Sequence, residues 1–155
     1  MKFYNREHEM AKLKEVREQA YNDHSRLTVV TGRRRIGKTS LIIKAMEGEP
    51  FIYLFVGRKN EAALCTGYYK EIASKLNIFV PSITTFQELF AFLMQQGETR
   101  KFTLVIDEFQ EFFHINPSIY SDIQNYWDQY RLNTHVNFIV SGSVYSLMTQ
   151  IFQHY

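Results

Sequence analysis

Residues 32–39 read Gly32-Arg33-Arg34-Arg35-Ile36-Gly37-Lys38-Thr39, which matches the phosphate-loop pattern G-x-x-x-x-G-K-[ST] at every defined position. The apolar run 27–31 before it predicts a β-strand, and the run 39–46 after it predicts a helix. In that setting the glycines let backbone N–H groups wrap a phosphate, while the Lys38 ammonium reaches the β- and γ-phosphates. The Thr39 hydroxyl can bind Mg²⁺, and the helix dipole faces the same anion. We therefore expect residues 32–40, up to Ser40, to bind a nucleoside triphosphate.

The composition is that of one globular domain. Of its 155 residues, 45% are hydrophobic and 15% aromatic, which is enough for a substantial core. The net charge of +2 is too small to indicate nucleic acid by itself. The single cysteine, Cys65, excludes an internal disulfide, and we expect it to be an inert core thiol. The polar N-terminus and the lack of a long apolar run predict a cytoplasmic protein without membrane association.

Strand-like and helix-like runs alternate along the chain. Strands are expected at residues 27–31, 51–56, 102–106 and 136–141, and helices at 6–20 (capped by Asn5), 39–46, 61–76, 84–96 and 119–131. The run 51–56 is apolar throughout, which indicates a strand buried on both faces. Helix 84–96 has a stripe typical of packing against a sheet: Phe86, Leu89, Phe90, Leu93 and Met94. This alternation predicts an α/β fold, a parallel sheet with flanking helices in three αβα layers.

A second motif, Asp107-Glu108, ends the strand at 102–106. In phosphate-loop NTPases an acidic residue at this place holds Mg²⁺, so Asp107 is a predicted metal ligand together with Thr39. Glu108 is the predicted general base for the water that attacks the γ-phosphate. Taken alone, two carboxylates at a strand end are equally typical of solvated surface charge. Their occurrence after a phosphate loop favours the catalytic interpretation.

The order of the motifs also indicates the kind of NTPase. A strand and long helices separate the two motifs in sequence, and a glutamate follows Asp107, as in the additional-strand, catalytic-glutamate division. No guanine-reading N-K-x-D motif occurs, so ATP is favoured over GTP. At the end of the run 136–141, Ser141 and Ser143 are both candidates for a sensor near the γ-phosphate. A plain Ser-Gly-Ser strand exit is the alternative.

Together these segments resemble the archaeal-type ATPase family, which groups with the AAA+-like and signal-transduction NTPases. The resemblance covers essentially the whole chain and is carried by residues 3–7, 31–40, 106–110 and 139–143. It implies that residues 3–7, including Asn5 and Arg6, lie beside the adenine and that Gln110 lies near the γ-phosphate. The loop arginines Arg33, Arg34 and Arg35 could contact phosphates or a neighbouring subunit. Solvated loop-tip charge explains any one of them equally well.

The resemblance also bears on the end of the chain. Relatives continue past the Ser141 strand into a further helix, a fifth strand and a helical lid, often with another domain. This chain ends at Tyr155 in a helix-like run, so we expect residues 1–155 to form one ATPase core without those elements. No arginine finger can then be assigned, which affects turnover more than binding, since such an arginine contributes about 10³–10⁵ in rate.

Three functions are compatible with these observations. The leading hypothesis is a Mg²⁺-dependent ATPase that hydrolyses the β–γ bond and drives conformational change in an attached domain or a protein partner. The second is a nucleotide-dependent switch that binds ATP with little turnover. The third is a DNA-associated motor, but core packing explains the aromatic residues at 109–113 and 126–130 more simply than DNA binding does. A homo-oligomer that completes the site between subunits is an analogy with similar ATPases.

Overall fold

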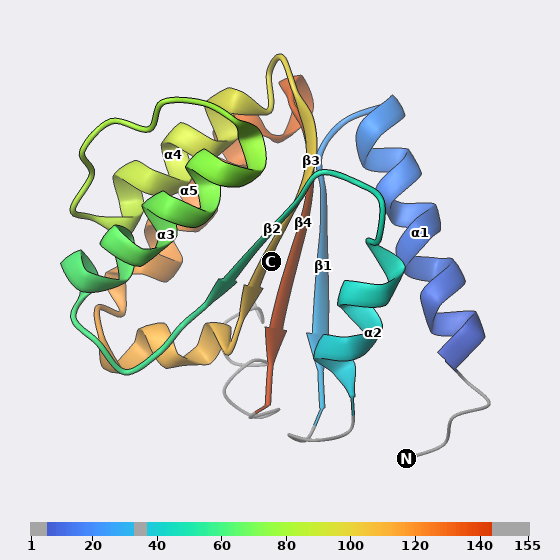
Figure 1. Cartoon of the computed structure of the whole chain (residues 1–155), viewed down its shortest axis with the longest axis horizontal. Helices are drawn as coiled ribbons and strands as arrows, with labels where there is room; N and C mark the ends of the chain where they lie inside the picture. The colour runs from blue at the N-terminus through green and yellow to red at the C-terminus, as the bar shows by residue number, and fades with distance from the viewer. Residues whose placement is uncertain (1–5, 33–36, 144–155) are drawn as a thin grey trace.

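The computed structural model describes residues 6–32 and 37–143. Within them, a single parallel sheet contains β1 (Arg26–Thr31), β2 (Phe51–Phe55), β3 (Lys101–Asp107) and β4 (His135–Gly142). One face is covered by α1 (Arg6–Asn22) and α2 (Lys38–Ala45), and the other by α3 (Glu61–Leu76), α4 (Phe86–Gln96) and α5 (Ser118–Tyr130) (Figure 1). The predicted three-layer αβα fold is confirmed. Within the described part of the chain, no helix combines the length and the hydrophobicity needed to cross a bilayer.

The strand order places the two sequence motifs on strands that are not adjacent. In the sheet the order is β1-β4-β3-β2, so β4 separates the phosphate-loop strand from the Asp107 strand. Along the chain β2 lies between them, but in space β2 lies beyond β3. Ser141 on β4 pairs with Val30 on one side and with Asp107 on the other. Because all strands are parallel, their carboxyl ends meet at one edge of the sheet, where open α/β sheets bind ligands (Figure 1).

The expectation that residues 51–56 form a strand buried on both faces was wrong. Burial alternates along β2: Ile52 and Leu54 are buried under α3 and α4, whereas Phe55 is 51% exposed. The reason is that β2 is the outermost described strand, next to β3, whereas α1 packs mainly against β4, β1 and β3. The Tyr53 N–H on this edge donates to the Glu71 carboxylate at 3.1 Å, which satisfies a group that would otherwise face an open edge.

The larger part of the core lies between the sheet and helices α3, α4 and α5. The predicted stripe of α4 is almost completely buried, and its rings contact Phe112 (4.7 Å from Phe86) and Phe138 (5.2 Å from Phe90). Phe109, Phe112 and Trp127 are also buried, and Tyr126 and Tyr130 are partly buried against the same cluster, which confirms core packing for these five aromatic residues. Phe113 is the exception, at 49% exposed. A smaller cluster on the opposite face joins α1 and α2 to the sheet through Leu13, Leu41, Ile42, Ala45, Met46, Val105 and Ile139.

Helix ends follow their capping residues. Asn60 caps α3 through a hydrogen bond from the Ala63 N–H at 2.8 Å, and Thr85 caps α4 through one from Glu88 at 3.3 Å. Helix α4 therefore begins at Phe86, two residues later than expected. Two short 3₁₀ helices were not predicted, η2 (Phe109–His114) and η3 (Arg131–Asn133). The expected cap Asn5 lies outside the described residues.

The expected inert thiol is also buried. Cys65 lies on α3 within the larger core, and burial, with smaller contributions from nearby carboxylates, raises the pKa of its thiol to about 11. The thiol therefore stays protonated at neutral pH, which disfavours reactions that need a thiolate.

We expect Gly97→Ala to lower the free energy of unfolding by about 1–3 kcal/mol, because overpacking a rigid core has this cost. A Cβ at Gly97 would lie 2.4 Å from the buried Val136 methyl and 3.1 Å from the Met94 carbonyl oxygen. The matched control is Gly67→Ala on α3, where a Cβ meets open space and a gain of up to about 1 kcal/mol is expected. Urea unfolding measures both, and a Gly97→Ala variant as stable as wild type would contradict the close contact.

Candidate active site

Thr39 and Asp107, the two predicted metal ligands, are brought into contact by the fold. Thr39 lies in the first turn of α2 and Asp107 is the last residue of β3, and the Thr39 hydroxyl donates to Asp107 Oδ2 at 3.0 Å. The hydroxyl proton is used by the carboxylate, while the hydroxyl oxygen keeps lone pairs for a cation. Hydroxyl and carboxylate oxygens are the hard donors that Mg²⁺ prefers. The donor set therefore fits Mg²⁺.

The rest of the metal's coordination would have to come from other sources. Among residues 6–32 and 37–143 there is no group of three His, Cys, Asp or Glu side chains that could hold a metal ion. Mg²⁺ is commonly bound through only one or two carboxylates, with phosphate oxygens and water completing its octahedron. A site of this kind therefore suits a metal that arrives with a phosphate ligand.

The start of α2 has the features of an anion site. Gly37 is the N-cap in a left-handed conformation (φ 81°), which glycine adopts without steric cost, and it has no side chain to cap the helix. Lys38 follows and is only 8% exposed. In the described part of the structure its ammonium forms no ion pair. Lysine is rarely buried without a partner, so a phosphate at this helix start fits the observed arrangement.

Glu108 is held in a specific and unusual conformation. Its backbone is left-handed (φ 56°), which is costly for a non-glycine residue and is concentrated at functional sites. The Glu108 N–H donates to Asp107 Oδ1 at 2.9 Å. Its side chain is buried, and Oε2 accepts hydrogen bonds from Gln110 Nε2 at 2.5 Å and from the Ser143 hydroxyl at 2.9 Å. The Glu108 backbone therefore links the two carboxylates, and Gln110 of η2 and Ser143 after β4 fix the orientation of the Glu108 side chain.

The structure distinguishes the two candidate serines. Ser141 is buried in register with Asp107, and within the described residues its hydroxyl has no hydrogen-bond partner. Ser143 is partly exposed and contacts Glu108 directly, with Gln110 Nε2 at 3.4 Å from the same hydroxyl. Ser143 is thus the serine that touches the predicted base, and Ser141 lies two residues before it, on β4.

Tyr53 belongs to this site and was not predicted. Its hydroxyl donates to Asp107 Oδ2, the oxygen that also accepts from Thr39. Burial foremost, and then the Asp107 carboxylate, raise the pKa of the Tyr53 phenol well above its usual value, so it remains a donor at neutral pH. Strand alternation puts residues 51, 53 and 55 on one face, but only the pairing of Tyr53 with Val105 shows that this face meets Asp107.

Several predicted residues are not brought into these contacts. Asn5, Arg33, Arg34, Arg35 and Ile36 lie outside the described residues, and so does the side chain of Arg6, the first residue of α1. Gly32 follows β1 at the same edge of the sheet, and Ser40 is exposed in the first turn of α2. Their predicted contacts with a nucleotide stay predictions.

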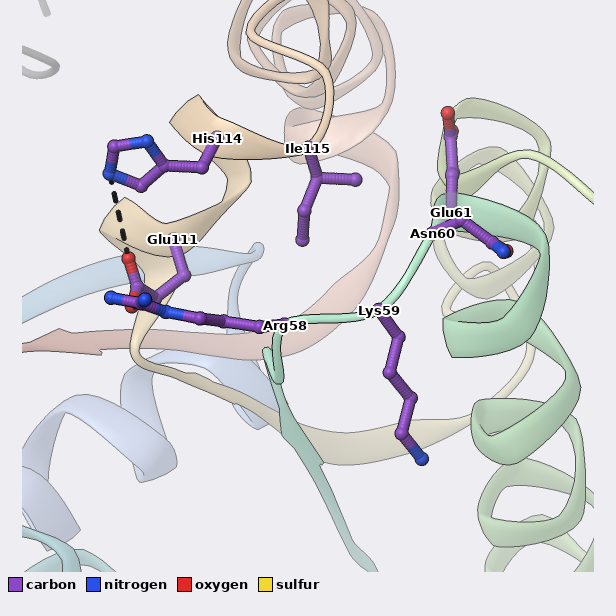
Figure 2. Close-up of a pocket in the computed structure, with 7 residues that line it drawn as sticks. All are labelled: Arg58, Lys59, Asn60, Glu61, Glu111, His114 and Ile115. Atoms are coloured by element: carbon purple, nitrogen blue, oxygen red, sulfur yellow. Dashed lines mark ion pairs between the residues drawn. The ribbon is translucent and has the colours of Figure 1, made fainter.

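A separate cavity of about 610 Å³ lies between η2 and the start of α3. Figure 2 shows Glu111 and His114 of η2 on one side and Asn60 and Glu61 at the start of α3 on the other, with Arg58 directed toward Glu111. Glu111 pairs with Arg58 at 3.5 Å and with His114 at 4.0 Å. The lining mixes both signs of charge and includes neither Asp107 nor Glu108. It is distinct from the Thr39–Asp107 site.

The sheet order, the phosphate loop after β1 and the acidic pair at the end of β3 define a P-loop NTPase fold with an additional strand between the two motif strands. The chain belongs to a family described as an ATPase domain predominantly from Archaea, whose model matches residues 3–154. The resemblance inferred from the motifs is therefore confirmed. An uncharacterized protein of Methanocaldococcus jannaschii is 31% identical over 150 residues, which cover 94% of this chain and 30% of that protein.

Solved structures share the fold. The Walker-type ATPase PABY2304 of Pyrococcus abyssi superposes with a TM-score of 0.69 at 23% identity, covering 96% of this chain and 47% of that chain. Cdc6p from Pyrobaculum aerophilum gives a TM-score of 0.64 at 21% identity, covering 93% of this chain and 40% of that chain. The chain thus spans less than half the length of each of these proteins and of the Methanocaldococcus relative.

Proposed function

We propose that this chain is the core of an ATPase that binds ATP with Mg²⁺ and hydrolyses the β–γ phosphate bond. The observation that carries the proposal is the contact of Thr39 with Asp107 at 3.0 Å, directly beside the buried Glu108. Two motifs 68 residues apart in sequence converge there at the carboxyl edge of the sheet. Membership in a family of ATPase domains supports the same activity.

In this proposal each residue of the phosphate loop has a defined task. The backbone N–H groups between Gly32 and Thr39 bind the phosphates, and Lys38 neutralises the β- and γ-phosphate oxygens. Thr39 and Asp107 would hold the metal. Mg²⁺ bound there would supply positive charge that neutralises the phosphates. Asn5 and Arg6 would lie beside the adenine.

Glu108 is the proposed general base. It orients a water molecule and accepts its proton as the water oxygen bonds to the γ-phosphorus and the bond to the β–γ bridging oxygen breaks, which yields ADP and inorganic phosphate. Gln110 and Ser143 hold the carboxylate in place. Ser141 is retained as a proposed sensor of the γ-phosphate from β4.

The proposed output is a conformational change in an attached domain or protein partner, in the cytoplasm. The nucleotide-dependent switch is the second candidate, and one observation favours it. One carboxylate oxygen of the proposed base, Glu108 Oε2, already accepts hydrogen bonds from Gln110 and Ser143. If those bonds persist with ATP bound, Glu108 would be a poor base, and the chain would bind ATP with little turnover.

Calorimetry of Mg²⁺·ATP binding, with phosphate release followed in the same samples, tests the proposal. We expect Lys38→Ala to weaken ATP binding about ten- to hundredfold, the range for losing a hydrogen bond to a charged group. The matched control is Lys44→Ala, an exposed lysine in the last turn of the same helix, for which affinity should change by less than about twofold.

The outcomes separate the candidates. Binding lost in Lys38→Ala together with turnover in the wild type supports an ATPase core that suffices by itself. Binding without phosphate release favours the switch. No binding by a folded wild-type chain would overturn both.

A further inference from the structure

Tyr53 reaches the metal site from a strand that carries neither nucleotide motif. On β2, Tyr53 pairs with Val105 and Phe55 pairs with Asp107, so Tyr53 and Asp107 are diagonal neighbours on adjacent strands. Tyr53 and Val105 both pack in the smaller core cluster under α1 and α2, which places the two side chains on one face. A tyrosine is long enough to span this diagonal, and its hydroxyl does so.

The Asp107 carboxylate is held by three donors. Oδ1 accepts from the Glu108 N–H, and Oδ2 accepts from the Thr39 and Tyr53 hydroxyls. Two of these donors belong to the motifs themselves. Tyr53 is the third, and it is the one whose position depends on the pairing of β2 with β3.

The elements around Tyr53 fix its position. Its backbone lies in the β2–β3 ladder on one side, and on the other side its N–H donates to the Glu71 carboxylate of α3 at 3.1 Å. Its ring lies 6.5 Å from that of Phe51. A phenol held in this way presents its hydroxyl at a defined point, as a preorganised site requires.

We propose that Tyr53 is a positioning residue of the magnesium site, which orients the Asp107 carboxylate so that it and Thr39 can take Mg²⁺ together with ATP. The inference rests on the function proposed above. Partners that hydrogen-bond to a metal-ligating carboxylate fix its orientation, and losing one typically reduces metal affinity or activity by about 10–100-fold. Tyr53 acts through Asp107 and needs no contact of its own with the nucleotide.

The test is Tyr53→Phe, which removes the hydroxyl and keeps the ring. ATP binding is measured by calorimetry across a series of Mg²⁺ concentrations and without free metal in EDTA. We expect the Mg²⁺ concentration for half-maximal effect to rise about 10–100-fold, whereas metal-free ATP affinity changes by less than about twofold. Electron paramagnetic resonance with Mn²⁺ in place of Mg²⁺ should show the same loss of bound metal, independently of turnover.

The matched control is Tyr68→Phe. Tyr68 lies on α3, on the opposite face of β2, and its partly buried hydroxyl donates to the Phe55 carbonyl oxygen at 2.7 Å. This variant loses a partly buried hydrogen bond to the same strand without touching Asp107, so its metal dependence should equal that of the wild type. A purely structural role for Tyr53 would give the two variants the same profile.

Asp107→Ala separates failure of this inference from failure of the proposed function. If Asp107→Ala abolishes the effect of Mg²⁺ but Tyr53→Phe matches the wild type, the inference is wrong and the ATPase proposal stands. A lower Mg²⁺ requirement in Tyr53→Phe would also overturn it, because Tyr53 would then compete with the metal. If wild-type protein shows no ATP binding at any metal concentration, the proposed function itself fails.

Discussion

Glu108→Gln is expected to reduce ATP hydrolysis by about 10²–10⁴-fold, the usual contribution of a general base, and to leave Mg²⁺·ATP affinity within about twofold of wild type. The substitution keeps the shape of the side chain, and the amide oxygen can still accept from Gln110 and Ser143. What it removes is the ability to take a proton from water. Single-turnover phosphate release together with calorimetry measures both quantities on one sample.

Glu111→Gln provides the matched control for this prediction. The same chemical change is made three residues further along, on η2, where Glu111 pairs with Arg58 and His114. Its turnover should stay within about threefold of wild type, because the pairs it loses are partly exposed and weak. If Glu108→Gln and Glu111→Gln lose equal activity, Glu108 is not the base. If neither variant nor wild type releases phosphate while all bind ATP, the switch hypothesis is favoured.

Phe90→Ala is expected to lower the free energy of unfolding by about 3–5 kcal/mol, the range for truncating a buried phenylalanine. Phe90 is fully buried on α4, with its ring 5.2 Å from that of Phe138 on β4 and 6.3 Å from that of Phe86. The truncation would leave a cavity between α4 and the strand that carries Ser141. Urea unfolding monitored by circular dichroism measures the loss.

Phe79→Ala makes the same truncation where the ring is 82% exposed. Its stability should stay within about 0.5 kcal/mol of wild type, because surface substitutions rarely do more. A loss for Phe90→Ala no greater than that for Phe79→Ala would show that α4 does not pack on β4 as described.

Local sequence patterns were sufficient where the physics is local. The α4 stripe was predictable because a helix repeats every 3.6 residues, so its apolar positions define one face. The start of α3 was predictable because a helix start depends on its capping residue, here Asn60. The interpretation of β2 failed because an apolar run does not reveal whether a strand lies inside a sheet or at its margin. That depends on strand order, and β2 lies beyond β3.

The site divides in the same way. The phosphate loop and the acidic pair are each a short contiguous stretch, because each depends on the backbone geometry of a single turn. The presence of both motifs predicted that Thr39 and Asp107 would meet. The clamp of Gln110 and Ser143 on Glu108 could not be derived from sequence, because it requires η2 and the end of β4 to converge. For the same reason the sequence left Ser141 and Ser143 as equal candidates.

The sequence by itself thus determined the class of protein and the nucleotide motifs, and with them the residues proposed to hold phosphate and metal, because each motif depends on neighbours along the chain. The tertiary structure alone decided that β4 separates the motif strands, that Ser143 touches the proposed base and that Tyr53 joins the proposed metal site. These features depend on strand register, where a shift of one residue reverses the face on which a side chain lies. Register is set by packing across the whole domain, and Tyr53 reaches Asp107 only because the pairing of β2 with β3 places them on one diagonal.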